Sequence, residues 1–569
     1  MAVYTGTVRR GRIGHRGHKF FQWYTMRYKL QIVSLMTGLL VSVFCLPRSV
    51  AADDTSDSPT EPNTHRRRII ISDDGEVGVG PRVLKPTVFR YVPTPEDVPT
   101  VRFDKTVGTQ VDTYILNIAA TDRGPMEEGT PITHVQSSMA QFYYWGDYGE
   151  IHPDTEKATR ILIRSAREAG MEIIASIRVN DSHDAPTPGA SKLHYPLKRE
   201  HPELLLGSGQ ILEKGGWSYG EDTIMGWYWS GLNFAKPEVP QHFLKFIAAY
   251  CPEYDFDGLE LDFYRHPRFF RFGEERQNLE TMSDFVRQVR QILNQIGEAR
   301  GRPYLLAARI PETPAWARRC GLDVQQWLEE DLLDMVTLGG GYMAYSAKMK
   351  EFIDLGHRHE VPVYGCINKL NDMQKVRTLA SNFWALGADG VYVFNWGIAK
   401  RPPFPDPVEQ RRCLQQIGNP ETLLGLDKRY LPANGEGPKG WRGTINRPPW
   451  FPIRLADGDP IELVVGDDVR KASVEGILDE IHMTVNVDNM ELTEGIRIEI
   501  NDVALAPQQI ERTAEDRFEA VVTAPPLWRG INEIVVLPGA GSIGRLASTV
   551  TSLELSVRYT QLARSPVSR

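Results

Sequence analysis

The segment 255–267, which reads DFDGLELDFYRHP, alternates carboxylates with apolar residues. Successive side chains of a strand point to opposite faces, so Glu260 and Asp262 share one face while the apolar residues between them share the other. Burying two carboxylates is costly unless a polar network or an active site requires them. This pair is therefore the first candidate for chemistry in the chain.

Glycoside hydrolysis needs two carboxylates that flank the scissile bond, about 5 Å apart for retention of configuration and farther apart for inversion. We predict that Asp262 is the nucleophile because it ends a strand, with Arg265 and His266 near enough to keep it ionised. Glu260 lies one step deeper and is predicted to orient other groups. Glu312, past the next strand, is the predicted general acid/base.

Asp181 and Asp184 are rivals for the acid/base role. Together with His183 and His266 they could instead bind a divalent metal and perform a metal-assisted hydrolysis. Hydrogen bonding to sugar hydroxyls is the simpler role for the two histidines. We predict no metal and no other cofactor.

A repeat of short apolar strands and longer amphipathic segments begins near residue 111 and predicts parallel strands joined by helices. The predicted strands are 114–119, a weak one at 134–139, 172–178, 258–263, 304–310, 334–338, 361–367 and 390–395. The predicted helices, by apolar spacing and capping residues, are 154–169, 279–296, 324–333 and 373–386. This order favours a (β/α)₈ barrel, with a doubly wound open sheet as the alternative.

After residue 455 the pattern changes to strands separated by turns, which predicts a β-sandwich. Its predicted strands are 461–465, 480–487, 495–500, 517–522, 532–537 and 552–559. The predicted organisation is a signal peptide (1–51), a disordered linker (52–90), the barrel (91–430), a linker (431–455) and the sandwich (456–562).

Active sites of such barrels lie at the carboxyl ends of the strands. Polar and aromatic residues follow six of the predicted strands, and we predict that they bind substrate. They are Arg178, Asn180, Asp181, His183 and Asp184 after the third; Tyr264, Arg265 and His266 after the fourth; Arg309 at the end of the fifth; Tyr342 after the sixth; Asn368 after the seventh; and Asn395 and Trp396 after the eighth.

Several of these residues are cationic, together with Lys369, which is unusual for a neutral sugar site. We therefore predict a substrate with carboxylate or sulfate groups, which arginine binds bidentately. The alternative is that Arg178 and Arg309 form an internal ion-pair network with Glu260 and Asp262.

A long loop, 179–239, follows the third predicted strand, and loops of this length in compact domains are usually functional. It contains Trp227 and Trp229, which we predict to stack on sugar rings. The alternative is that the loop's aromatic residues pack the loop against itself.

The N-terminus resembles a secretion signal. A basic region precedes the apolar run 30–46, and small residues at Ser49, Ala51 and Ala52 supply a cleavage site. This predicts a secreted or periplasmic protein with no stable membrane insertion after cleavage. An uncleaved membrane anchor is the alternative, and Met26 is an alternative start.

Charge and cysteine content restrict the classes of partner. The net charge of −8 becomes −16 once the eight Arg and Lys of the first 51 residues are removed, which disfavours nucleic-acid binding. Cys251, Cys320, Cys366 and Cys413 are widely spaced and are expected to be buried free thiols rather than a disulfide framework. The predicted partner is a polysaccharide or oligosaccharide substrate, and the oligomeric state is left open.

Four segments resemble secreted bacterial glycosyl-hydrolase-like proteins of the family-10-like barrel group. They are FDGLELDFYRHP, IASIRVNDSHD, GLDVQQWLEEDLLDMVTLGGGY and DGVYVFNWG, and the likeness covers roughly residues 90–430. The resemblance implies a (β/α)₈ barrel with glycosidase activity on a polysaccharide.

The chain also departs from related patterns. Family 10 xylanases have catalytic Glu residues on strands four and seven, where this chain has Asp262 and Asn368. The strand-four segment also resembles the family 18 motif DGxDxDxE, but Tyr264 replaces its acid. An Asp on strand four with Glu312 after strand five resembles the layout of α-amylase-like barrels. A non-catalytic glycan-binding barrel and a metal-dependent hydrolase of another bond remain the alternatives.

Overall fold

The structure is a computed structural model, and all of its described residues lie in one compact unit, His65–Arg569. The described residues are 67–73, 77–79, 90–92, 94–118, 133–134, 153–182, 185, 198, 201–207, 226, 228–339, 347–368, 372–394, 406–432, 451–490, 495–523, 526–539 and 548–560. The predicted signal peptide lies outside them. Among these residues, no helix is long and apolar enough to cross a membrane.

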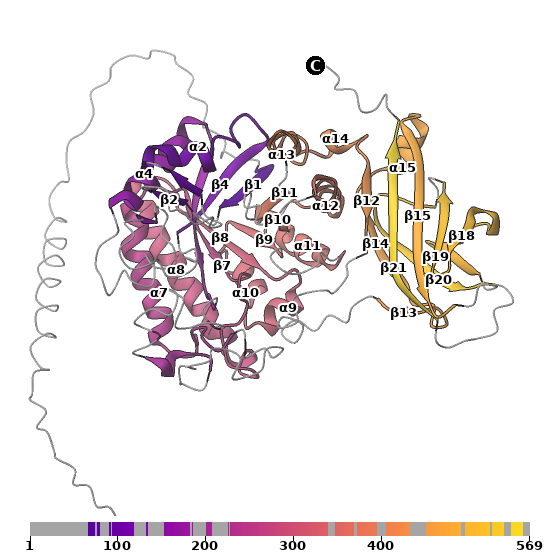
Figure 1. The fold of residues 1–569 in the computed structure, drawn as a ribbon. Coiled ribbons are helices and arrows are strands. Elements are labelled where there is room, and N and C mark those ends of the chain that lie inside the picture. The colour runs from indigo at the N-terminus through magenta and orange to yellow at the C-terminus, as the bar shows by residue number, and fades with distance from the viewer. Residues whose placement is uncertain are drawn as a thin grey trace, which may run out of the picture. The chain divides into compact units, whose positions relative to one another are not determined.

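Eight parallel strands close into a barrel in the order β1-β11-β10-β9-β8-β7-β6-β4, and β4 pairs back with β1 (Figure 1). The strands are β1 (Ile69–Asp73), β4 (Val111–Asn117), β6 (Glu172–Arg178), β7 (Gly258–Asp262), β8 (Leu305–Ile310), β9 (Met335–Leu338), β10 (Val363–Asn368) and β11 (Gly390–Phe394). The predicted (β/α)₈ barrel is confirmed, and the open sheet is excluded because no edge strand remains in a closed barrel.

The start of the barrel differs from the prediction. Ile69–Asp73 lies within the predicted disordered linker, yet it is the first barrel strand and all five residues are buried. The strand predicted as the first, β4, is therefore the second. The weak strand predicted at 134–139 is not in the barrel, because β5 (Thr133–His134) pairs instead with β2 (Val77–Val79) in a small sheet with β3 (Arg90–Val92).

Ion pairs explain how such a short first strand is held. Arg67 makes a bidentate contact with Glu172 of β6, at 2.7 Å for both oxygens, and Thr113 of β4 donates to the same carboxylate. Arg68 similarly binds Asp112. Arg67 and Arg68, which lie in the range predicted as a disordered linker, therefore hold β1 in place at the amino end of the barrel.

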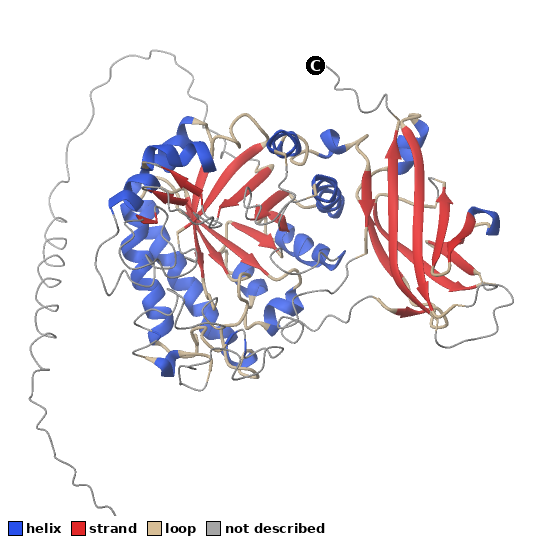
Figure 2. Ribbon diagram, viewed as in Figure 1, coloured by secondary structure: helices blue, strands red, loops and turns tan. Residues whose placement is uncertain are grey.

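Helices pack around the barrel strands (Figure 2). They are α2 (Val98–Arg102), α4 (Pro153–Glu168), α7 (Glu238–Tyr250), α8 (Leu279–Arg300), α9 (Pro314–Arg319), α10 (Val324–Glu329), α11 (Lys350–Arg358), α12 (Met373–Leu386), α13 (Pro407–Leu414) and α14 (Pro420–Leu423). The four predicted helices are confirmed. In α12, Asp372 caps the first turn and Gly387, with φ 93°, ends the last one.

The C-terminal region forms two antiparallel sheets around their own apolar core. One sheet contains β12 (Lys428–Tyr430), β13 (Ile453–Arg454), β15 (Leu478–Asp488), β18 (Ile510–Ala514), β19 (Arg517–Val522) and β21 (Thr549–Tyr559). The other contains β14 (Ile461–Val465), β16 (Ile496–Ile500), β17 (Val503–Ala504) and β20 (Gly530–Pro538), and α15 (Val469–Val474) follows β14. Buried residues alternate along β15 and β21, as expected for a β-sandwich. Although β12 lies in the range assigned to the barrel, it pairs with β21.

A buried polar cluster joins the sandwich to α12. Lys428 of β12 donates to Asp467 at 2.9 Å, and Tyr559 of β21 donates to the same carboxylate at 2.7 Å. Ser381 of α12 donates to the other oxygen of Asp467 at 3.1 Å. Each group of the cluster is buried, so its charges are balanced by neighbours rather than by water.

The interior of the barrel changes from apolar to polar along the strands. An apolar group near its middle consists of Ile70, Ile115, Ile174, Ala307, Met335, Tyr364, Cys366, Tyr392 and Phe394. Residues two positions further along a strand lie on the same face. At those positions five of the strands have buried polar residues, namely Ser72, Asn117, Ser176, Arg309 and Thr337. The carboxyl end of the barrel is thus the polar end.

Candidate active site at the carboxyl end of the barrel

Strand register brings Asp262 between two arginines. Arg178 of β6 and Arg309 of β8 are its register partners on the two neighbouring strands. Paired residues of parallel strands point to the same side, so all three side chains lie inside the barrel. The strand-end prediction for these residues is therefore correct in placement, and their roles remain predictions.

The carboxylate of Asp262 is held by three hydrogen bonds. One oxygen accepts from the backbone N–H groups of Tyr264 (3.0 Å) and Arg265 (3.1 Å), and the other accepts from Arg309 at 2.8 Å. Burial lowers the pKa of Arg309, but the charge and hydrogen bond of Asp262, together with the neighbouring Cys366 and Tyr392, outweigh burial, so that pKa is raised and the guanidinium stays charged. This fixes the orientation of Asp262.

Two aromatic rings lie against the guanidinium of Arg309. Its guanidinium carbon lies 4.3 Å from the ring centroid of Phe394 and 5.7 Å from that of Tyr264. Both rings are buried, so these cation–π contacts are desolvated and favour a single position of the guanidinium. Tyr264, predicted to bind substrate, thus contacts a neighbour of Asp262.

Glu260 lies one layer deeper than Asp262 and is fully buried. Its Oε1 accepts from Ser176 (2.7 Å) and from Tyr392 across the barrel (3.1 Å), whereas its Oε2 has no hydrogen-bond partner among the described residues. Burial and the neighbouring charge of Asp262 raise the pKa of Glu260 to about 7. Near neutral pH this carboxyl group therefore exchanges a proton while Asp262 stays paired with Arg309.

Asp181 forms a second buried cluster beside the first. Its carboxylate lies 3.3 Å from Arg178 and 3.7 Å from Nδ1 of His266, and its backbone carbonyl accepts from Lys198 at 3.1 Å. Arg178 therefore lies between two carboxylates, that of Asp262 in register and that of Asp181 in contact. Of the predicted network of Glu260 and Asp262 with Arg178 and Arg309, the structure shows the pair of Arg309 with Asp262, and Arg178 pairs with Asp181.

Glu312 follows β8 and is buried beside Gly339, which follows β9. A Cβ at Gly339 would lie 2.6 Å from Cγ of Glu312, and Gly339 has φ +68°, so only glycine suits this position. The carbonyl of Gly339 also accepts from Arg309 at 3.3 Å. Arg309, which binds Asp262, and Glu312 are thus both neighbours of Gly339.

Two predicted substrate-binding residues instead hold the long loop in place. Asn180 donates to the carbonyls of Leu232 (3.0 Å) and Arg268 (2.8 Å), and its Oδ1 accepts from the N–H of Leu232. Trp229 is fully buried and donates to the carbonyl of Ala185 at 2.9 Å. For Trp229 the structure favours packing of the loop over sugar stacking.

The sequence prediction missed Asp73, which ends β1 at the same end of the barrel. Asp73 is buried, accepts from Arg102 at 2.8 Å and is also bonded by Tyr114. The signal was present, since an apolar run ending in an acid is the pattern that identified β7. It was overlooked because the surrounding charges suggested a linker.

Some predicted site residues lie outside the described part of the chain. These are Trp227, His183, Asp184, Tyr342, Asn395 and Trp396. Asn368 ends β10 in register with Phe394, as predicted, but its side chain is not described.

The described residues test the prediction for the cysteines but not the metal alternative. The four described cysteines are buried free thiols, as predicted. Within the described ranges there is no group of three or more His, Cys, Asp or Glu that could hold a metal ion. Because His183 and Asp184 lie outside those ranges, the metal alternative is not tested.

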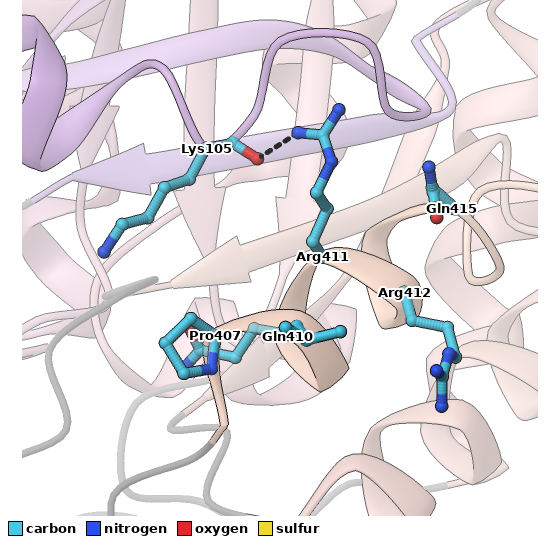
Figure 3. A pocket seen from close by; sticks show the side chains of 7 residues that line it. Lys105, Pro407, Gln410, Arg411, Arg412 and Gln415 are labelled. Carbon is cyan, nitrogen blue, oxygen red and sulfur yellow. Dashed lines mark hydrogen bonds between the residues drawn. The ribbon is translucent and has the colours of Figure 1, made fainter.

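A cavity of about 450 Å³ lies beside α13 and shares no residue with the strand-end clusters (Figure 3). Its lining includes Lys105, Val408, Arg411 and Arg412. Arg411 donates to the backbone carbonyl of Lys105 at 3.1 Å, and Arg412 pairs with Glu409 at 3.0 Å. In the close view the three cationic side chains point in different directions, so they do not converge on one ligand position.

Comparisons with known proteins find distant similarity to solved structures alone. No family model matches this chain, and no curated protein matches it. Similar solved structures include an α-amylase from Malbranchea cinnamomea (12% identity, TM-score 0.32, covering 84% of this chain and 98% of that one). A family GH18 chitinase from Chromobacterium violaceum has 12% identity and a TM-score of 0.28, covering 88% and 92%.

A cycloisomaltooligosaccharide glucanotransferase from Paenibacillus sp. has 10% identity and a TM-score of 0.31. The match covers 87% of this chain but only 57% of the glucanotransferase. At these identities and TM-scores the likenesses carry no argument about reaction or substrate.

Proposed function

We propose that this chain is a glycoside hydrolase that cleaves O-glycosidic bonds in a polysaccharide. The observation that carries the proposal is the fixed carboxylate of Asp262 at the carboxyl end of the fourth barrel strand, between the register partners Arg178 and Arg309. Active sites of (β/α)₈ barrels lie at this end. Glu312, which like Arg309 is a neighbour of Gly339, supplies the second carboxylate.

In the proposed mechanism Asp262 stabilises or attacks the developing oxocarbenium carbon while Glu312 protonates the leaving oxygen. A water molecule then bonds to that carbon and gives its proton to Glu312, which releases the sugar and restores both carboxyl groups. Glu260 interacts electrostatically with Asp262 on the same strand face, and it holds a proton when Asp262 is ionised. The alternative of a non-catalytic glycan-binding barrel is favoured by one observation, namely that both oxygens of Asp262 already have protein partners.

The test is release of reducing sugar from a panel of neutral, uronic and sulfated polysaccharides. We expect wild type to be active and Asp262→Asn to lose roughly a thousandfold in rate. Glu330→Gln is the matched control, because that carboxylate pairs with Arg287 on the surface. Activity that survives in Asp262→Asn would move the chemistry elsewhere, and inactivity of wild type on the whole panel would favour the glycan-binding alternative.

We also propose that the substrate carries acidic groups. Among the residues that the structure describes, and outside the pairs Arg102–Asp73 and Arg268–Glu275, buried cations around the strand ends outnumber carboxylates once Glu260 holds its proton. The cations are Arg178, Lys198, Arg265 and Arg309, and the carboxylates are Asp181, Asp262 and Glu312. Equal rates on neutral and acidic glycans would contradict this proposal.

The proposal includes export, with the segment 1–51 removed as a signal peptide. The support is the basic, apolar and small-residue order of that segment. Amino-terminal sequencing of the protein recovered outside the cytoplasm tests it. We expect a start near residue 52, and a retained apolar run would instead indicate an anchor.

A further inference from the structure

An exposed tryptophan, Trp528, lies on the sandwich, in the loop between β19 and β20. The side chain of Trp528 is 42% exposed, although the adjacent Leu527 is fully buried. A single exposed apolar residue is common on protein surfaces and needs no explanation by itself. Trp528 differs from such residues because hydrogen bonds fix its loop and an arginine lies beside its ring.

The ring is held in one position by a hydrogen-bonded loop. Its indole N–H donates to the carbonyl of Ile531 at 2.9 Å, and its backbone N–H donates to Asn532 at 3.1 Å. Asn532 is buried and donates back to the carbonyls of Trp528 and Gly530. Asn501 donates to Asn532 at 2.9 Å. Since the indole N–H is already used, the ring offers only its faces to a ligand.

Arg470 borders the ring of Trp528. Arg470 of α15 donates through Nε to the carbonyl of Leu527 at 2.9 Å, and its guanidinium carbon lies 5.8 Å from the Trp528 ring centroid. Among the described residues, its two terminal amino groups have no partner. Arg529, the next residue along the chain, is exposed, and Val474, one helical turn from Arg470, is 90% exposed.

We propose that Arg470, Val474, Trp528 and Arg529 form a second glycan-binding site, which binds an acidic polysaccharide chain outside the barrel. The C–H face of a sugar lies on the fixed indole, and the carboxylate or sulfate of that sugar receives the free amino groups of Arg470. The acidic class of substrate rests on the proposed function. Charge complementarity favours this ligand, because the exposed Arg470 lies against the aromatic ring and a second exposed arginine, Arg529, follows Trp528 in a chain of net charge −8.

A binding assay on the full chain separates this site from catalysis. The parent is Glu312→Gln, so that the polymer is not degraded, and affinity electrophoresis uses gels with polygalacturonate or with neutral dextran. We expect Trp528→Ala to weaken retention by polygalacturonate about tenfold, the equivalent of roughly 1.4 kcal/mol, while Trp528→Phe retains most of it. Arg470→Gln should weaken the polygalacturonate interaction by a similar factor.

The control is Val521→Ala, an exposed valine on the other sheet, which should bind like the parent. Thermal unfolding of each variant shows whether the sandwich is intact. Unchanged retention in folded Trp528→Ala would overturn the proposal, as would a dimer that dissociates in Trp528→Ala without any change in glycan retention. Hydrolysis of short oligosaccharides by Trp528→Ala in the wild-type background should be unchanged, so failure of the barrel's proposed activity is distinguishable from failure of this site.

Discussion

At the scale of residues, the raised pKa of Glu260 is the most informative single feature. Two donors, Ser176 and Tyr392, bind one of its oxygens, while the other is buried without a partner among the described residues. Asp262, in contrast, has a cation and two backbone N–H groups. The two carboxylates on one strand face therefore have different environments, and burial together with the charge of Asp262 raises the pKa of Glu260.

This arrangement predicts a pH-dependent stability. The pKa of Glu260 rises from 4.5 to about 7 on folding, so the native state binds this proton more tightly than the unfolded chain does. Between these two values the group's contribution to stability falls as pH rises, by on the order of 3 kcal/mol. Glu260→Gln is permanently neutral and should be more stable than wild type at pH 8, with the difference shrinking toward pH 5.

Denaturant unfolding at several pH values measures that difference. Glu330→Gln is the control, because its surface pair with Arg287 lowers the pKa of Glu330 and no gain at high pH is expected. Parallel stability curves for wild type and Glu260→Gln would contradict the assignment of the proton to Glu260.

At the scale of elements, the turn after β9 determines where Glu312 lies. Gly339→Ala would force a left-handed backbone on alanine and place its Cβ against Glu312. Gly170, with φ +70° and nothing within 4 Å of a Cβ, is the matched control. Gly170→Ala should lose about 1 kcal/mol of stability from the left-handed backbone alone, and Gly339→Ala should lose more because its Cβ also displaces Glu312.

Only Gly339→Ala should also lose activity, because it displaces the side chain proposed as the acid. Steady-state kinetics of both variants on the same substrate make the comparison. Equal activities would show that the position of Glu312 does not affect the reaction.

Much of the arrangement of elements could be predicted from sequence, for identifiable reasons. Strands β6 to β11 are apolar runs with polar residues at their carboxyl ends, and parallel register then places Arg178, Asp262 and Arg309 side by side. Strand β1 could not be recognised because its buried run of five residues lies among charges whose partners, such as Glu172, are over 100 residues away. The bond from Tyr392 to Glu260 spans the barrel and has no local signal.

At the scale of the whole molecule, the buried cluster of Lys428, Asp467, Tyr559 and Ser381 couples the sandwich to α12. Burial lowers the pKa of Lys428, and Asp467 opposes this shift. Removing one partner leaves an uncompensated buried charge, so Lys428→Met should cost about 3–5 kcal/mol.

Replacing both charges with Lys428→Met and Asp467→Leu should recover part of that loss. A double-mutant cycle by denaturant unfolding gives the coupling energy. Additive losses in the double variant would show that the two charges do not depend on each other.

The central claim is that Asp262 and Glu312 divide the chemistry of glycoside cleavage. The most direct test is the first-turnover release of phenol from aryl glycosides of the sugar that the enzyme hydrolyses. When the leaving group of an aryl glycoside is an acidic phenol, the phenolate departs without protonation. Glu312→Gln should therefore cleave such a glycoside nearly as fast as wild type but fail on the natural linkage. Asp262→Asn should fail on both. Rapid cleavage of the activated glycoside by Asp262→Asn would contradict the account.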